Sequence, residues 1–295
     1  MFLLVNSVAK QCGMYQYGFR FYRILKDGGV TFDYVEVDAA DQYVAAIKGY
    51  DAIVHNFLLF PWLSSCLDPT SRNYFIYHEG WAANGVQDWQ IINADPTKPN
   101  GIPRPLYFPK VIPTPRAPNL ECPTIGSFGL GLYNKHFDRI VRVVQDEFDN
   151  AIIRFRMPFA FYVDPDGVEA KHVVKMCFDS LHKPGIKLSV CHDFGSDEDI
   201  ATFLGENDLN MFLYRDVDEN RGCASATDFA LSAGRPFAIS SSTMFRHVFD
   251  ESICVDTSSL KSIMCQGIAK HSDKLQRWSH VNLIDSFSFK VILRT

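Results

Sequence analysis

Apolar runs of strand length alternate with amphipathic helical segments along most of the chain. In the first part five runs predict strands, and they are residues 2–7, 32–37, 51–57, 74–80 and 90–94. Helical patterns lie between them, for example over 19–25 and 42–47. Strands that alternate with helices form parallel sheets covered by helices on both faces, so this part is expected to be a doubly wound α/β domain.

Prolines interrupt the alternation between residues 96 and 123, where their density prevents a regular helix and favours a stiff connection. The alternation then resumes, with strands expected at 124–129, 151–159, 186–194 and 210–214 and helices at 135–148, 168–181, 196–207 and 260–270. We therefore expect an N-terminal Rossmann-like domain over residues 1–115 and a second one over 116–273. A last helix, over 274–295, is expected to pack back across the domain junction.

Composition narrows the class of protein. A chain of 295 residues with 47% apolar residues can bury the cores of two domains. The formal charge of −5 argues against a global attraction to nucleic acid or anionic membranes. The eight cysteines are scattered without a C-x-x-C pair, as in reduced cytoplasmic proteins. No apolar stretch approaches the ~20 residues of a membrane span, and we expect a cytoplasmic protein, in the host cytoplasm if a virus encodes it.

The segment over 210–236 carries the strongest functional signal. An apolar strand ends in a polar loop, small residues open a helix that carries one carboxylate, and G-R-P begins the next strand. A helix N-terminus offers unpaired N–H groups and a positive dipole end to a diphosphate, and small residues let it come close. The residues assigned to this site are Gly222, Ser225, Ala226, Thr227 and Asp228. We expect Asp228 to accept hydrogen bonds from ribose hydroxyls, and Asp228→Ala to leave stability almost unchanged, because no buried charged partner is evident.

Two histidines, His55 and His78, end consecutive predicted strands, and Glu79 follows the second. Carboxyl ends of central strands carry the chemistry of such folds, and histidine exchanges protons near neutral pH. All three are therefore candidate site residues, with a purely structural hydrogen-bonding role as the alternative for either histidine.

Three arginines are candidate anion ligands. Alternation along a strand sends Arg154 and Arg156 to one face, where two arginines require an anionic partner, while Arg221 stands beside the turn at Gly222. The alternative for the strand pair is a set of salt bridges near the strand end.

Several short motifs resemble the retaining glycosyltransferases of the GT-B fold. Asn220 and Asp228 stand eight positions apart and resemble the family's E-x7-E signature, although neither is Glu and the usual spacing to G-x-P would select Phe229. The segment from Gly129 to Lys135 resembles G-R-x(4)-K-G, with a leucine at the arginine position. The HEG at the end of the fourth strand resembles the family's H-D or H-E.

The resemblance implies two Rossmann-like domains facing across a cleft and transfer of a hexosyl or pentosyl group from a nucleoside diphosphate sugar to a hydroxyl acceptor, with retention. It assigns the donor diphosphate to Gly129 and Lys135, helped by an arginine, and the transferred sugar to His78 and Glu79. It further implies a glycine-bearing loop on the acceptor side, for which we name Gly13, Tyr15, Tyr17 and Gly18, with His55 nearby. No cofactor is expected beyond the sugar nucleotide.

The sequence also raises the question of a metal site and allows two alternative functions. The D-x-D at Asp216 resembles a metal motif, but such triplets arise by chance and no His/Cys cluster supports it, so no metal is expected. A transferase acting on modified DNA bases would use a basic stripe at Lys98, Arg104, Lys110 and Arg116. A non-catalytic nucleotide- or glycan-binding module would tolerate the loss of His78 and Glu79.

Overall fold

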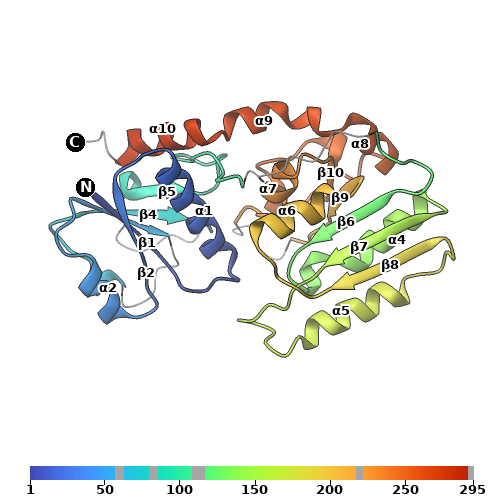
Figure 1. Ribbon diagram of the computed structural model, residues 1–295, viewed down its shortest axis with the longest axis horizontal. Coiled ribbons are helices and arrows are strands. Elements are labelled where there is room, and N and C mark those ends of the chain that lie inside the picture. Colours follow the sequence, from blue (N-terminus) through green and yellow to red (C-terminus); the bar gives the residue numbers. More distant parts are fainter. Residues whose placement is uncertain (57–62, 80–85, 108–116, 217–221, 292–295) are drawn as a thin grey trace. The chain divides into compact units, whose positions relative to one another are not determined.

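The computed structural model describes residues 1–56, 63–79, 86–107, 117–216 and 222–291 (Figure 1). The chain divides into two compact units. Unit 1 comprises residues 1–105, 220–223 and 277–295, and unit 2 comprises 106–219 and 224–276. Each unit is built on one five-stranded parallel sheet.

The sheet of unit 1 has the strand order β2-β1-β3-β4-β5. Its strands are β1 (Phe2–Asn6), β2 (Phe32–Glu36), β3 (Ala52–Asn56), β4 (Arg72–Tyr77) and β5 (Ile91–Asn93). All five lie within three residues of the bounds of the expected runs, since continuous apolar stretches are typical of strands buried on both faces. The order reverses beside β1, which pairs with both β2 and β3.

Helices cover both faces of this sheet. On one face α1 (Gly13–Asp27) and α10 (His280–Val291) pack over β3 and β4, with the rings of Phe21 and Phe287 4.9 Å apart. On the other face lie α2 (Ala40–Ala46) and α3 (Leu63–Cys66). The last helix therefore belongs to unit 1. Helix α1 begins six residues before the expected start, because its apolar face already includes Tyr17.

The sheet of unit 2 has the order β10-β9-β6-β7-β8 and reverses between β6 and β9. Its strands are β6 (Thr124–Phe128), β7 (Ala151–Arg156), β8 (Ile186–Cys191), β9 (Leu209–Phe212) and β10 (Phe237–Ile239). Its helices are α4 (Phe137–Glu147), α5 (Val168–Asp179), α6 (Asp197–Gly205), α7 (Ala226–Ser232) and α8 (Leu260–Gln266), and α9 (Ser272–Arg277) follows.

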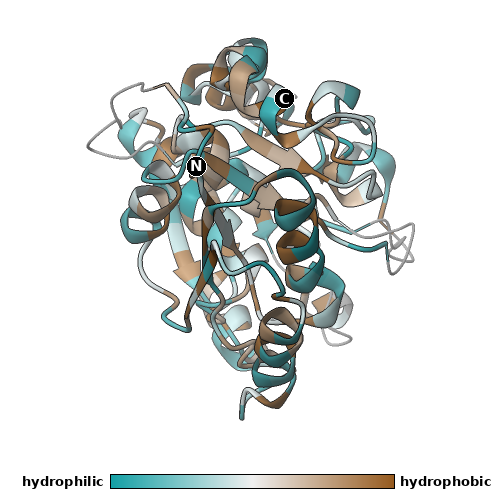
Figure 2. Cartoon of the chain, turned by 90° about the vertical axis from the view of Figure 1, so that its right-hand side faces the viewer, coloured by the Kyte–Doolittle hydropathy of each residue, from teal (hydrophilic) through white to brown (hydrophobic). Residues whose placement is uncertain are grey.

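Aromatic contacts show which face each helix of unit 2 covers. Phe137 of α4 packs on Phe155 of β7 with ring centroids 5.0 Å apart, while Phe229 of α7 packs on Phe128 of β6 at 5.7 Å. Phe128 is in register with Arg156, the next residue after Phe155, so the two contacts lie on opposite faces. In Figure 2 several helices carry apolar and polar residues on different sides, as expected for helices that cover a sheet. No helix in the described part of the chain is long and apolar enough to cross a membrane.

Candidate functional site

His78 lies at the carboxyl edge of the unit 1 sheet, directly after β4. Its Nε2 is 2.8 Å from Oδ1 of Asn56, the last residue of β3. The Asn56 amide nitrogen donates to Oδ1 of Asn6 at 2.9 Å and to the carbonyl of Met14 at 2.8 Å. Because both amide hydrogens are used there, the Asn56 oxygen accepts, and the neutral His78 ring donates from Nε2. Its Nδ1 is then left as a hydrogen-bond acceptor.

The surroundings of His78 keep its ring neutral. The ring stands edge-on to Tyr17, with centroids 4.7 Å apart, and the buried guanidinium of Arg104 lies 5.0 Å from the Tyr17 ring. Desolvation by the surrounding protein, and secondarily the charge of Arg104, lower the pKa of His78 to about 3. At neutral pH His78 is therefore suited to accept a hydrogen bond from a hydroxyl and is a poor proton acceptor.

Two of the expected site glycines permit close packing around His78. A Cβ on Gly222 would lie 2.2 Å from the His78 carbonyl oxygen and 3.7 Å from Cγ of Glu79. A Cβ on Gly18 would lie 2.1 Å from the amide nitrogen of Asn56. Gly222 is thus brought to the predicted pair His78 and Glu79, whereas Gly18 serves the packing of α1 on Asn56.

The glycine-bearing loop expected on the acceptor side is helical instead. Gly13, Tyr15, Tyr17 and Gly18 all lie in α1, because the helical period of the apolar residues extends to its start. The Tyr15 hydroxyl donates to Glu36 at 2.8 Å, and burial together with this carboxylate raises the pKa of Tyr15. Tyr17 is a core residue that contacts His78 with its ring.

His55 belongs to the core on the opposite face of the sheet. It is fully buried, its Nε2 lies 3.0 Å from Oδ1 of Asn73, and its ring stacks on Phe75 at 4.7 Å. Burial lowers its pKa to about 4, against the opposing effect of the Asn73 hydrogen bond. This placement corrects the acceptor-side role expected for His55, because its side chain is fully buried among Asn73 and Phe75.

In unit 2, Lys135 and Gly129 meet at Tyr214. The segment after β6 forms a 3-10 turn over Tyr133–Lys135, and Nζ of Lys135 lies 3.6 Å from the centroid of the Tyr214 ring. A Cβ on Gly129 would lie 3.3 Å from the Tyr214 hydroxyl. Tyr214 itself is buried, which raises its pKa. The loops after β6 and β9 therefore bring both predicted residues of the G-R-x(4)-K-G resemblance to one place.

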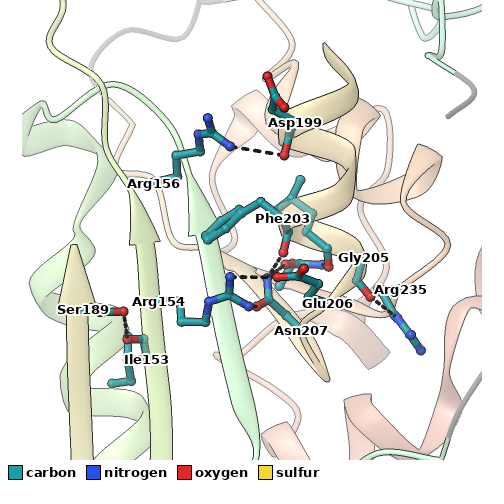
Figure 3. A network of polar contacts seen from close by, with 12 residues as sticks. Ile153, Arg154, Arg156, Ser189, Asp199, Phe203, Gly205, Glu206, Asn207 and Arg235 are labelled. Atoms are coloured by element: carbon teal, nitrogen blue, oxygen red, sulfur yellow. Dashed lines mark hydrogen bonds and ion pairs between the residues drawn. The ribbon is translucent and has the colours of Figure 1, made fainter. Parts of the chain in front are cut away.

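Arg154 and Arg156 project from β7 toward α6, on one face as predicted (Figure 3). Arg154 pairs with Glu206 at 2.9 Å, and its guanidinium lies 4.9 Å from the ring of Phe203. Arg156 donates to the backbone carbonyls of Asp193 at 3.0 Å and Asp199 at 3.2 Å. Contacts within the protein therefore explain the positions of both arginines, and no diphosphate is needed. For Arg154 this agrees with the alternative of a salt bridge near the strand end. Arg221 and Asn220 lie outside the described residues.

Asp228 is buried inside unit 2. Its side chain and that of His247 are both wholly buried, with Oδ1 and Nε2 3.8 Å apart. The hydroxyl of Thr227 donates to the Ala224 carbonyl at 2.9 Å and lies 3.1 Å from His247 Nε2. The expectation that Asp228 lacks a buried partner is thus corrected, because the ionisable ring of His247 lies beside it. Ser225 and Ala226 stand at the start of α7, and Ser225 makes no side-chain cap.

Asp216 of the D-x-D triplet and Arg104 of the basic stripe make structural contacts, and Asp218 lies outside the described residues. Oδ1 of Asp216 accepts from Ser242 at 2.6 Å and from the backbone of Thr243 at 2.9 Å. Across the described residues no three His, Cys, Asp or Glu side chains are grouped as metal ligands. Arg104 is buried and donates to the Ala94 carbonyl at 2.8 Å, so it cannot join a surface stripe with the exposed Lys98. Lys110 and Arg116 lie outside the described residues.

Sequence reasoning missed Asn6 and Asn56, which orient His78. The sequence did contain a signal for them, because each asparagine is a polar residue at the end of an apolar strand. His78 likewise follows the end of the apolar strand β4. Both are fully buried in the structure, and only the pairing of β1 with β3 shows that they meet.

Neither a scan against protein-family models nor a search of curated proteins gave a match. Solved structures do match. HepE of Anabaena, in complex with UDP-glucose, aligns with a TM-score of 0.64 over 98% of both chains at 11% identity. AviGT4, a glycosyltransferase involved in avilamycin A biosynthesis, aligns with a TM-score of 0.60 over 98% of this chain and 96% of its own at 10% identity.

The chain has the GT-B fold. A third match with this fold is an alpha-glucosyltransferase in complex with UDP and a 13-mer DNA, with a TM-score of 0.54 over 97% of this chain and 94% of that one at 9% identity. In open parallel sheets, ligands bind outside the carboxyl ends of the strands where the strand order reverses. In unit 2 of this GT-B fold, that point lies between β6 and β9, where Lys135 and Tyr214 meet.

Proposed function

We propose that this protein transfers a sugar from a nucleoside diphosphate sugar, with UDP as the first nucleotide to test, to a hydroxyl acceptor. The observation that carries the proposal is the match of both parallel sheets, over nearly the whole chain, to a protein solved with UDP-glucose. The placement of Lys135 at the strand-order reversal of unit 2 supports the same assignment.

The proposed reaction breaks the bond between the sugar C1 and the diphosphate oxygen and forms a bond from C1 to the acceptor oxygen. Lys135 stabilises the negative charge that grows on the departing diphosphate. His78, neutral and with Nδ1 as acceptor, receives a hydrogen bond from a hydroxyl of the transferred sugar. The acceptor proton passes to the departing phosphate oxygen, so retention needs no separate carboxylate base.

Nucleotide binding tests the proposal directly. Thermal unfolding with UDP, GDP and ADP and their glucose conjugates is expected to show one nucleotide that raises Tm. A ligand at 100 times its Kd stabilises by about 2.7 kcal/mol, a readily measured shift. NMR of the product from an α-linked donor is then expected to show an α-linkage. No shift with any nucleotide would overturn the function, binding without turnover would favour a non-catalytic module, and a β-linked product would remove retention alone.

Replacing His78 with alanine is expected to lower kcat/KM about 3- to 10-fold, the loss of one neutral hydrogen bond to the sugar. With a pKa near 3 the ring stays neutral as pH rises from 5 to 8, and protonation begins only as pH falls toward 3. The variant should therefore change the level of the pH profile and not its shape. The exposed His182→Ala serves as the control, and a step near pH 6.5 that vanishes only in His78→Ala would contradict the assignment.

A further inference from the structure

A diphosphate at Lys135 requires more positive charge than one lysine supplies. The leucine at position 130 replaces the arginine of the resembling motif, and Arg154 and Arg156 are engaged with α6 (Figure 3). The described part of unit 2 offers another cation at the same place, Arg215, in the loop after β9.

Arg215 is held beside the Lys135 turn by the backbone. Its N–H donates to the carbonyl of Asn134 at 2.9 Å, which ties the loop after β9 to the loop after β6. These two strands are paired neighbours, and the sheet order reverses between them. Arg215 therefore stands at the point of the sheet where parallel folds bind ligands.

The guanidinium of Arg215 is available to a ligand. Arg215 is exposed, and within the described residues its side chain has neither an ion pair nor a hydrogen bond. The neighbouring carboxylate of Asp216 is directed to Ser242 and Thr243. Arg139 and Arg142, the other arginines near His136, are paired with Asp256 and with Asp138.

Charged groups from several elements of unit 2 act on His136, and Arg215 is one of them. Desolvation is the main cause that lowers the pKa of His136, and the charges of Arg139, Arg215 and Arg142 lower it further, against the opposing effect of Asp138. The side chain of Arg215 thus lies close to the residue that follows Lys135. Two cations from adjacent loops suit an anion with two phosphates, and an arginine can hold it with two parallel hydrogen bonds.

We propose that Arg215 is the second cation of the donor site and binds, together with Lys135, the diphosphate of a sugar nucleotide. This inference rests on the proposed function. In the resembling motif, the second positive charge is the arginine at the position of Leu130, after β6. In this chain Arg215 would supply that charge from the loop after β9, a different strand of the same sheet.

Calorimetric titration of UDP, UMP and uridine into the full-length protein and its variants tests the assignment. Arg215→Ala is expected to weaken UDP binding about 10- to 100-fold, as for a lost charged hydrogen-bond partner, and to leave uridine binding unchanged. Arg215→Lys should retain part of the affinity, since it keeps the charge without the fork. Arg154→Ala is the matched control and should bind UDP like the unmodified protein, because its charge is directed to Glu206.

Each outcome decides a separate point. Equal UDP affinity in the unmodified protein and in Arg215→Ala would overturn the inference and leave the proposed function intact. An equal loss for UDP and uridine would also overturn it, because the effect would then not depend on the phosphates. Absence of binding of UDP, GDP and ADP to the unmodified protein would remove the proposed function and, with it, the inference. Thermal unfolding of each variant separates loss of binding from loss of fold. If the alanine variant does not fold, the UDP affinity of Arg215→Lys tests the role of Arg215 instead.

Discussion

Replacing Lys135 with alanine is expected to lower kcat about 10²- to 10³-fold while changing the KM for the donor much less. The lysine lies at the end of the strand pair where the sheet order reverses, and its ammonium is positioned by the Tyr214 ring at 3.6 Å. A preorganised cation gains interaction energy as charge develops on the leaving diphosphate, and such donors contribute about 3 to 4 kcal/mol. Steady-state kinetics with varied sugar nucleotide measures both constants.

Lys261→Ala is the matched control for this prediction. Lys261 also lies over an aromatic ring, that of Phe148 at 5.3 Å, but Phe148 precedes β7 and so stands at the amino edge of the sheet. Its loss should leave kcat unchanged. A Lys135→Ala enzyme with a raised KM and an unaltered kcat would show that Lys135 binds the ground state and the transition state equally.

Replacing Asp228 with alanine is expected to lower the free energy of unfolding by about 2 to 3 kcal/mol. The carboxylate and His247 are wholly buried and 3.8 Å apart, so the truncation removes a buried polar contact and leaves a small cavity in the core of unit 2. Urea denaturation should show a lower midpoint with an unchanged m-value.

Asp146→Ala, at an exposed position of α4, is the control and should change stability by less than about 0.5 kcal/mol. Asp228→Asn keeps an oxygen beside His247 and should be the milder substitution. Nucleotide affinity of the folded Asp228→Asn protein then reports on ribose binding. An alanine variant of native stability with weakened nucleotide binding would return Asp228 to the ribose-binding role expected from the sequence.

The alternation of apolar and polar residues was sufficient to predict both sheets. Strands buried on both faces leave continuous apolar runs, and the helices between them leave a 3.6-residue period, so both signals are local in sequence. The two-residue alternation along a strand, which is also local in sequence, predicted that Arg154 and Arg156 lie on one face of β7. The register of β6 and β7 confirms this prediction. The sequence pattern predicted the start of α1 wrongly, because the glycines at 13 and 18 suggested a turn. In the structure both lie in the helix, and Gly18 packs against Asn56.

The sequence by itself therefore determined the α/β class, the strands and the candidate residues at strand ends. Only the tertiary structure decided what each candidate faces. His55 lies in β3 and His78 directly follows β4, yet His55 is enclosed by Asn73 and Phe75 while His78 meets Asn56 and Tyr17. The direction of a side chain along one strand follows a local period of two, but the group that it meets comes from a distant segment, as His247 does for Asp228. Partner and burial set the pKa and the accessibility of each group, and these separate a ligand-binding residue from a core residue.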